Sequence, residues 1–116
     1  MARTVVTSTK LARDGAINDV AGVAIDQPNG MQVLFNKPHK TIILISNTSA
    51  STRVVTVRKS SNSHDNPLAD FSSPAIPATT GLGVLGPFSG LYIQGDRIYL
   101  DFVAGHTGVV RAYELP

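Results

Sequence analysis

The residues best suited to chemistry in this chain are three histidines, because the sequence contains no cysteine. His39, His64 and His106 all fall in segments whose composition predicts turns or loops. A metal site needs several ligands that converge from regular elements, and none of these histidines has a second ligand at such a spacing. The nearest approach is His64 followed by Asp65, but adjacent loop residues are usually solvated separately. We therefore predict no metal site.

Two glycine-rich stretches invite comparison with catalytic loops. Residues 81–86 (GLGVLG) have the glycine spacing of a dinucleotide-binding loop, but that loop needs a helix directly after it, and here Pro87 follows instead. Residues 86–90 (GPFSG) differ from a nucleophile elbow because the serine stands one position too late. We expect residues 81–86 to form a turn or the edge of a sheet, and we expect no cofactor.

Carboxylate chemistry has equally little support. Glu114 is the only glutamate, so a pair of catalytic carboxylates would need two aspartates, such as Asp96 and Asp101. Asp101 is better explained as an outward-facing residue near Arg97 or Arg111 on neighbouring strands. These observations predict a protein that binds a surface and is not an enzyme.

The elements that would position these residues are predicted to be strands, because β-branched and aromatic residues alternate with polar ones between Gly, Pro, Asn and Asp. The expected strands cover residues 4–9, 31–36, 40–47, 53–59, 91–94, 97–102 and 109–113. The apolar run 42–45 suits a central strand that is buried on both faces. We expect the strands at 40–47 and 53–59 to pair as a hairpin. The last three strands should form an antiparallel meander with one apolar face, which packs on a second sheet.

The remaining segments are less regular. Residues 11–25 show rough helical spacing that Gly15 and Gly22 interrupt, so we expect extended structure or one short turn. Residues 60–80 contain three prolines and many small polar residues, which predicts a long loop. The predicted fold class is therefore all-β. We expect an extended N-terminal arm at residues 1–30, followed at 31–116 by an antiparallel β-sandwich of the jelly-roll or immunoglobulin-like type.

A candidate interface follows from the tyrosines. Tyr92, Tyr99 and Tyr113 share the outward phase of the last predicted strands, and Arg97 and Arg111 share it with them. Exposed tyrosines are typical of protein interfaces and of sugar-binding sites. The alternative is that these tyrosines cover a second sheet or pack under the long loop.

Composition agrees with a binding role. Apolar residues make up 42% of the chain and charged residues only 16%, which suggests a surface covered by a partner. The net charge is +2 and the basic residues are scattered, so we expect no nucleic acid partner. The longest apolar run, residues 42–45, is too short to span a membrane, and no signal peptide is visible. We expect no membrane contact and synthesis in a reducing cytoplasm.

Several segments together resemble a known family. They are residues 9–17, 29–31, 40–48, 100–102 and 108–113. The chain is similar to small, cysteine-free, β-rich virion proteins of tailed bacteriophages of actinobacteria. This resemblance implies a head decoration (cement) protein that binds the outside of the major capsid protein shell as a homotrimer. It also implies location on the virion after synthesis in the host cytoplasm. The family has no fixed motif, so the resemblance assigns no binding residues.

Two other functions stay open at this point. One is another virion component, such as a head–tail connector or a tail-tube subunit. The other is a carbohydrate- or receptor-binding module that uses the tyrosines.

Overall fold

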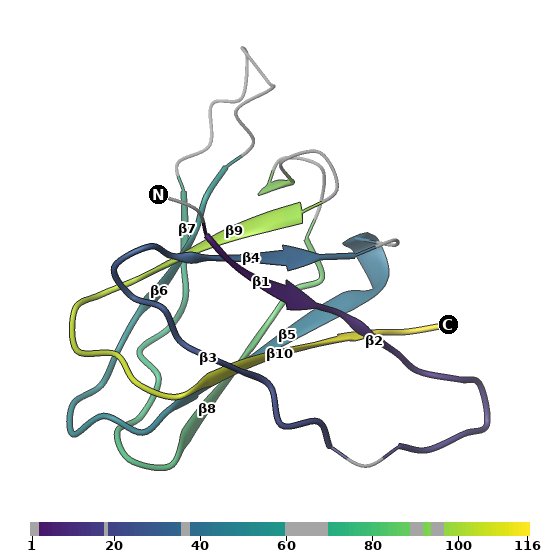
Figure 1. The fold of residues 1–116 in the computed structure, drawn as a ribbon, viewed down its shortest axis with the longest axis horizontal. Helices are drawn as coiled ribbons and strands as arrows, with labels where there is room; N and C mark the ends of the chain where they lie inside the picture. Colours follow the sequence, from purple (N-terminus) through teal and green to yellow (C-terminus); the bar gives the residue numbers. More distant parts are fainter. Residues whose placement is uncertain (1–2, 18, 36–37, 60–69, 89–91, 94–96) are drawn as a thin grey trace.

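Two β-sheets pack face to face in the computed structural model, which describes residues 3–17, 19–35, 38–59, 70–88, 92–93 and 97–116 (Figure 1). Sheet A has the strand order β1 (Thr4–Thr7), β4 (Met31–Leu34), β9 (Arg97–Phe102), β6 (Val55–Val57) and β7 (Phe71–Ser72). Sheet B has the order β2 (Thr9–Lys10), β10 (Val109–Glu114), β5 (Thr41–Asn47) and β8 (Gly81–Leu85), and β3 (Val23–Ala24) also pairs with β10. The described residues contain no α-helix, and Pro38–Lys40 form a 3-10 turn, η1. The prediction of an all-β sandwich is confirmed.

The N-terminal residues contribute to both sheets. The segment 1–30, which we expected to be an extended arm, carries β1, β2 and β3. β1 pairs with β4 at the edge of sheet A, and the chain then crosses to sheet B, where β2 pairs with β10 (Figure 1). Both pairings are parallel, whereas the other pairings between described strands are antiparallel. The sheets are therefore mixed, although the sequence suggested antiparallel pairing throughout.

Two predicted strand partnerships are wrong. The strands at 40–47 and 53–59 do not form a hairpin, because β5 lies in sheet B between β10 and β8 while β6 lies in sheet A between β9 and β7. β9 and β10 likewise lie in different sheets, so they are not neighbours in a meander. Alternation determines which face of a strand is buried, but either sheet of a sandwich accepts the same alternation. Of the predicted strand 91–94 only residues 92 and 93 are described, and neither lies in a strand.

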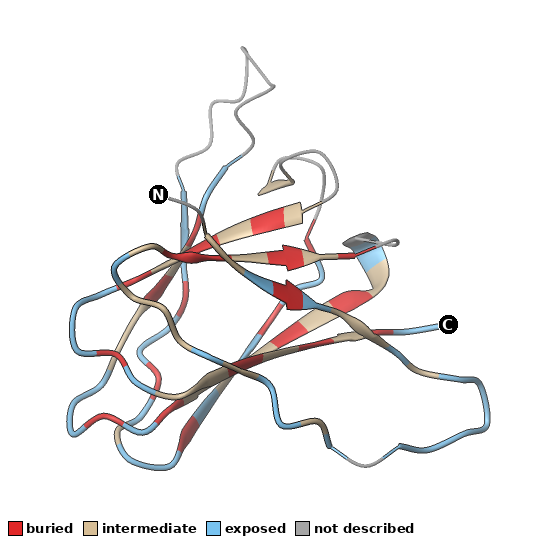
Figure 2. Cartoon of the chain, in the orientation of Figure 1, coloured by how far each residue is buried: buried red, intermediate tan, exposed pale blue. Residues whose placement is uncertain are grey.

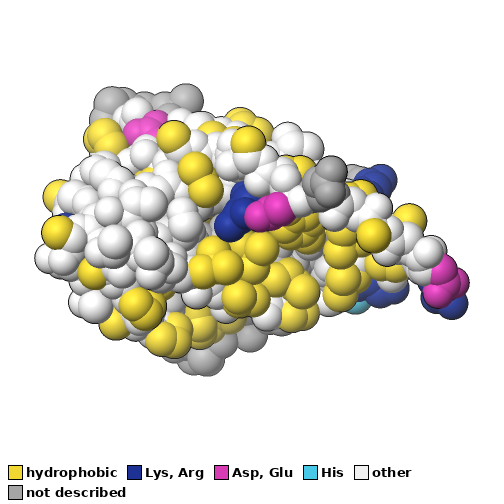
Figure 3. All heavy atoms as spheres, turned by 90° about the horizontal axis from the view of Figure 1, so that it is seen from below, with side chains coloured by type: hydrophobic (Ala, Val, Ile, Leu, Met, Phe, Trp, Pro, Cys, Tyr) yellow, Lys and Arg dark blue, Asp and Glu magenta, His cyan; other side chains and the backbone are white. Residues whose placement is uncertain are grey.

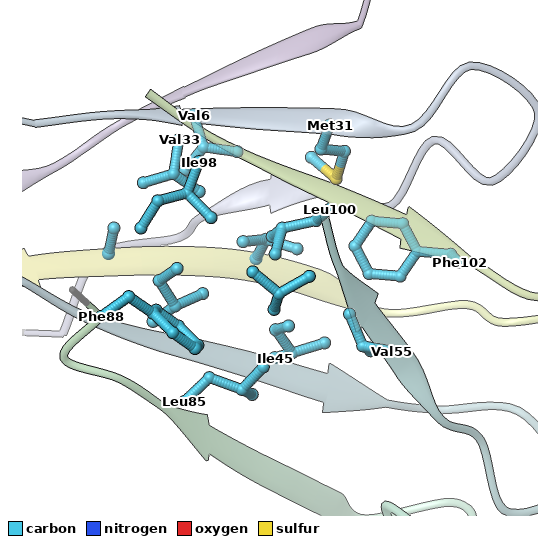
Figure 4. Packing of buried hydrophobic residues seen from close by; sticks show 14 of the residues in the cluster. Val6, Met31, Val33, Ile45, Val55, Leu85, Phe88, Ile98, Leu100 and Phe102 are labelled. Atoms are coloured by element: carbon cyan, nitrogen blue, oxygen red, sulfur yellow. The ribbon is translucent and has the colours of Figure 1, made fainter. Parts of the chain in front are cut away.

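The core lies between the two sheets and is filled by alternate side chains from both (Figures 2 and 4). On β9, Ile98 and Leu100 are fully buried, as their predicted inward phase requires. β5 departs from its prediction. Its inner residues, such as Ile45, are fully buried, but Ile42 and Leu44 are only half-buried on the outer face. Sheet B therefore has an apolar outer side that the core does not use.

One side of the sandwich is closed by residues 73–77, which belong to the predicted long loop. Ile76 is buried and forms a backbone bridge with Arg53, and its side chain lies so close to β8 that a Cβ on Gly83 would be 2.8 Å from Ile76 Cδ1. The glycine-rich residues 81–85 form the edge strand β8, which agrees with the sheet edge predicted for 81–86. Residues 60–69 of the predicted loop lie outside the described residues.

Asn47, at the end of β5, fastens this closing segment to the core. Its side chain is fully buried. The Nδ2 group donates hydrogen bonds to the carbonyl oxygens of Ser51, Ile76 and Pro77, at 2.9, 3.0 and 3.1 Å. The Oδ1 atom accepts hydrogen bonds from the backbone N–H and the hydroxyl of Ser49. One buried amide thus satisfies polar groups of two separate chain segments.

The Asn47→Ala substitution should therefore lower the free energy of unfolding by about 2–3 kcal/mol, because it leaves buried carbonyl groups without donors. Thr48→Ala is the matched control. Thr48 is the exposed neighbour, and its loss should cost less than about 0.5 kcal/mol. Urea unfolding of both variants measures the two values. Equal values for the two variants would show that Asn47 has no special role.

Candidate functional site

The five residues of the predicted interface do not form one surface. Tyr99 and Arg97 lie on the outer face of sheet A, because the alternate residues of β9 point into the core. Tyr113 and Arg111 lie on the outer face of sheet B for the same reason. The two pairs are therefore on opposite sides of the molecule. The sequence suggested otherwise only because β9 and β10 were expected to be neighbours in one sheet.

Tyr92 lies apart from the other tyrosines, in a cluster of three aromatic rings. Its ring centroid is 6.2 Å from that of Phe71 and 5.6 Å from that of Phe88, and the two phenylalanine rings are 5.6 Å apart. All three pairs meet edge to face, the arrangement that aromatic rings favour when they pack on one another. Phe88 belongs to the core and Tyr92 packs against it, whereas Phe71 is exposed. The three rings, with Gly86 and Pro87, line a pocket of about 490 Å³ that is separate from the other two tyrosines.

On the outer face of sheet A, the central charged group is Asp101. Its carboxylate accepts hydrogen bonds from Arg3 at 2.7 Å and from Arg58 at 2.9 Å. Burial alone would raise the pKa of Asp101, but the hydrogen bonds and charges of these two arginines outweigh it and hold the pKa below its usual value. Arg3 also lies over the Tyr99 ring, with 4.5 Å between the guanidinium carbon and the ring centroid.

These contacts correct the expectation that Asp101 lies near Arg97 or Arg111. Arg97 instead donates a hydrogen bond of 2.8 Å to Gln32 Oε1 on the neighbouring strand β4. The partners of Asp101 are Arg58 and Arg3, and Arg3, which directly precedes β1, is 98 positions away in the sequence. No sequence pattern indicated this contact, because it depends on the parallel pairing of β1 with β4. The network joins the N-terminal segment to sheet A.

A second polar cluster lies on the outer face of β10. Asp19 accepts hydrogen bonds from Tyr113 and Arg111, and the Tyr113 hydroxyl also accepts one from the Val20 N–H at 3.0 Å. The Tyr113 hydrogen bond is the largest cause that lowers the pKa of Asp19, and the Arg111 charge adds to it. Tyr113 and Arg111 therefore fasten the segment before β3 to sheet B.

The outer face of sheet B carries a group of apolar side chains, which we call the sheet B patch. It consists of Ile42, Leu44, Leu82, Val84 and Val109. The strand register places Leu44 directly opposite Val84, and the most exposed members are Leu82 at 49% and Val84 at 64%. Figure 3 views the molecule from the side on which β3, β8 and β10 lie, and shows hydrophobic side chains gathered in the middle of the view beside an adjacent basic and acidic side chain, with further charged side chains toward its edges.

Sequence reasoning missed this patch although its signal was present. Residues 42–45 are apolar in both phases of the strand, which we interpreted as burial on both faces of the sheet. A face exposed to a partner produces the same pattern. A second signal is the absence of charge, since residues 71–95 contain no Asp, Glu, Lys or Arg. A surface built from such a stretch is well suited to contact with another apolar surface.

His106 is the one described histidine whose environment differs sharply from the prediction. The residue follows a turn as expected, but its side chain is fully buried, with the ring edge-to-face against Phe102 at 5.4 Å. Nε2 lies 3.1 Å from the Ser46 carbonyl oxygen, while Nδ1 has no hydrogen-bond partner among the described residues. Burial, assisted by the charge of Arg53, lowers the pKa of His106 against the opposing effect of the Ser46 hydrogen bond.

No group of three or more metal-ligating side chains is present in the part of the chain that the structure describes. His64 and Asp65 lie outside that part. A buried, neutral His106 is a core residue and offers no exposed reactive group. The arrangement that the described residues do offer is the sheet B patch, which can bind an apolar surface.

The buried His106 should make stability depend on pH in a defined window. The unfolded chain takes up a proton on this imidazole near the ordinary pKa of about 6.5, whereas the folded protein takes it up only at lower pH. Stability is therefore full above that value and declines as the pH falls below it, by at most about 1.4 kcal/mol per pH unit. The decline should end once the pH falls below the pKa of the folded state.

Urea unfolding at a series of pH values, with His106→Gln as the comparison, tests this expectation. The variant lacks the group that titrates, so its free energy of unfolding should change less over the same window. The other two histidines are present in both proteins, so their contributions to the pH dependence cancel when the two unfolding free energies are subtracted. Parallel curves for the two proteins would contradict the assignment.

Comparison with known proteins adds no identification. No family model, curated protein or solved structure matches the chain. Among the described residues, no helix has the length and hydropathy needed to cross a membrane.

Proposed function

We propose that this chain is a non-enzymatic structural protein that binds another protein through the sheet B patch. More specifically, we propose that it is a decoration protein on the outside of a phage head. The observation that carries the proposal is the apolar outer face of sheet B, described above. The family resemblance of the sequence supports the more specific part.

Exposing this apolar face to water is unfavourable. Apolar surface removed from water contributes about 25 cal/mol per Å², so a contiguous apolar face is stabilised when a partner covers it. Monomeric proteins rarely expose large apolar patches, and those that occur often mark interaction sites. The core does not need these side chains, since Ile43, Ile45, Val110 and Ala112 already fill the inner side of the same strands.

The location of charge on the surface favours a protein partner. Arg111 is the charged side chain on the outer face of β10, next to the patch. Its ion pair with Asp19 neutralises its charge. The Arg3, Arg58 and Asp101 network lies on the opposite face, on sheet A. A nucleic acid partner would need unpaired basic residues near the contact. A protein surface of matching low polarity needs none.

The major capsid protein is the partner that the resemblance implies. A capsid shell repeats the same surface many times, so many weak contacts of a small subunit add up to stable coverage. Such a subunit would be made in the host cytoplasm and would reside on the virion. Covering the joint between neighbouring shell subunits would then oppose their separation.

Two rival functions fare differently. A connector or tail-tube subunit could use the same patch, and only the location of the bound protein on the particle separates it from a decoration protein. The carbohydrate-binding alternative required the three tyrosines to form one exposed surface. Tyr92, Tyr99 and Tyr113 lie in three separate places, so this alternative loses the surface on which it depended.

The test is binding of the purified chain to phage heads assembled without it. We expect binding to the head and not to the tail, visible by electron microscopy, and greater resistance of the decorated heads to heat. Leu44→Ser, in the centre of the patch, should weaken binding about tenfold or more, because it removes an apolar anchor from the interface.

Val5→Ser is the matched control. Val5 is 44% exposed on the outer face of sheet A, so its substitution removes a similar apolar side chain from the opposite side of the molecule. Both variants should unfold at similar urea concentrations to the wild type. If the wild type fails to bind heads, or if Val5→Ser weakens binding as much as Leu44→Ser, the proposal is wrong.

A further inference from the structure

We propose that two copies of this chain pair through strand β8, so that the two B sheets join into one continuous sheet across a two-fold axis. The pairing does not depend on shell binding or on the identity of any other partner. It follows from the free edge of β8, from the absence of charge around it, and from the spacing of its side chains.

β8 is the edge strand of sheet B. All five of its residues pair with β5 on one side, from Gly81 opposite Asn47 to Leu85 opposite Ile43. On the other side, no backbone hydrogen bond from the described residues reaches the strand. The backbone N–H and C=O groups on that side are therefore available to another strand, which is the partner that matches their spacing.

A groove borders β8, and residues 73–77 of the same chain form its other wall. The groove has a volume of about 220 Å³, and its lining includes both the outward-facing Leu82 and Val84 and the residues Pro74, Ile76 and Pro77. Ile76 lies on the inner side of β8, where it meets Gly83. Because β5 covers the other edge of β8, this groove lies beside the edge that faces residues 73–77.

β8 is the longest of the described edge strands. Natural edge strands avoid pairing by being short or by carrying charged residues or proline. β3 has two residues, β2 has two residues and includes Lys10, β7 has two residues and follows Asp70, and β1 has four residues and follows Arg3. β8 has five residues, with neither charge nor proline.

The charge pattern favours a second copy as the occupant. Residues 71–95 contain no charged side chain, so this stretch supplies both β8 and the opposite wall of the groove without any charge. A partner strand that carried Lys or Glu would have to bring that charge against an uncharged surface. A second β8 brings none, and the net charge of +2 per chain gives little repulsion between copies.

The side chains of β8 also complement themselves. In an antiparallel pair centred on Gly83, Leu82 of each copy lies opposite Val84 of the other, on the outer face. The two glycines lie opposite each other on the inner face. Pairing in this register brings the exposed Leu82 and Val84 of both copies together and joins the two sheet B patches into one apolar surface. A two-fold pair differs from the trimer that the family resemblance implies.

The first test is the mass of the purified full-length chain in solution, measured by sedimentation. We expect a dimer for the wild type. Val84→Lys places a charge opposite the partner's Leu82 twice in each dimer, and it should raise the dissociation constant about tenfold or more. Val103→Lys is the control, since Val103 is also exposed, at 45%, but lies after β9 and away from β8. It should leave the dimer unchanged.

The second test determines the register of the β8 pair by disulfide cross-linking. The chain has no cysteine of its own, so only the introduced cysteines can react. The Leu82→Cys/Val84→Cys double variant should form covalent dimers on oxidation, while each single variant should not, because only unlike positions face each other. Cross-linking of a single variant would overturn the Gly83-centred pairing. A monomeric wild type without cross-linking would overturn the two-fold pair, even if that monomer binds an extended peptide from another protein.

The two proposals fail in different ways. A wild type that dimerises but does not bind phage heads refutes the decoration role and leaves the β8 pair intact. A monomer that binds heads refutes the β8 pair and leaves the decoration role intact. Leu44→Ser should lose head binding and remain dimeric.

Discussion

The fold depends on burying the inward-facing side chains of both sheets in one shared core, so that each sheet shields the apolar face of the other from water. Ile45 on sheet B and Leu100 on sheet A are both fully buried, and neither sheet could shield its own apolar face alone. Packing the two sheets face to face satisfies this requirement without a disulfide, since the chain has no cysteine. The same requirement explains why the outer face of sheet B stands out. Leu44 and Val84 add nothing to the core, so their apolar character is better explained by a contact outside the chain.

Polar contacts hold the rest of the chain onto this core. Asn47 fastens the closing segment, while Arg3 with Asp101, and Asp19 with Arg111, fasten two parts of the N-terminal segment to opposite faces. Each of these contacts spans a long separation in the sequence. The surface is thereby divided into a charged face on sheet A and a mostly apolar face on sheet B. The proposed binding side is the apolar one, and the edge of β8 that pairs with no described strand borders it.

What could be predicted from the sequence is what depends on local alternation. The inward phase of Ile98 and Leu100 follows from period two within one strand, and so does the absence of a helix in the described part of residues 11–25. The choice of sheet and of partner strand could not be predicted, because an alternating strand fits either sheet equally well. The contact of Arg3 with Asp101 and the burial of His106 depend on that choice. The patch was missed because an apolar outer face and a buried one look alike in a single sequence.

The central claim is that the outer face of sheet B is covered in the assembled particle. Hydroxyl-radical footprinting of the chain, free and bound to phage heads, measures this most directly because it reports the solvent exposure of individual side chains. The account predicts that Leu44 and Val109 become protected on binding, while Val5 on the opposite face keeps the reactivity that it has in the free chain. Protection of Val5 with no change at Leu44 and Val109 would contradict it.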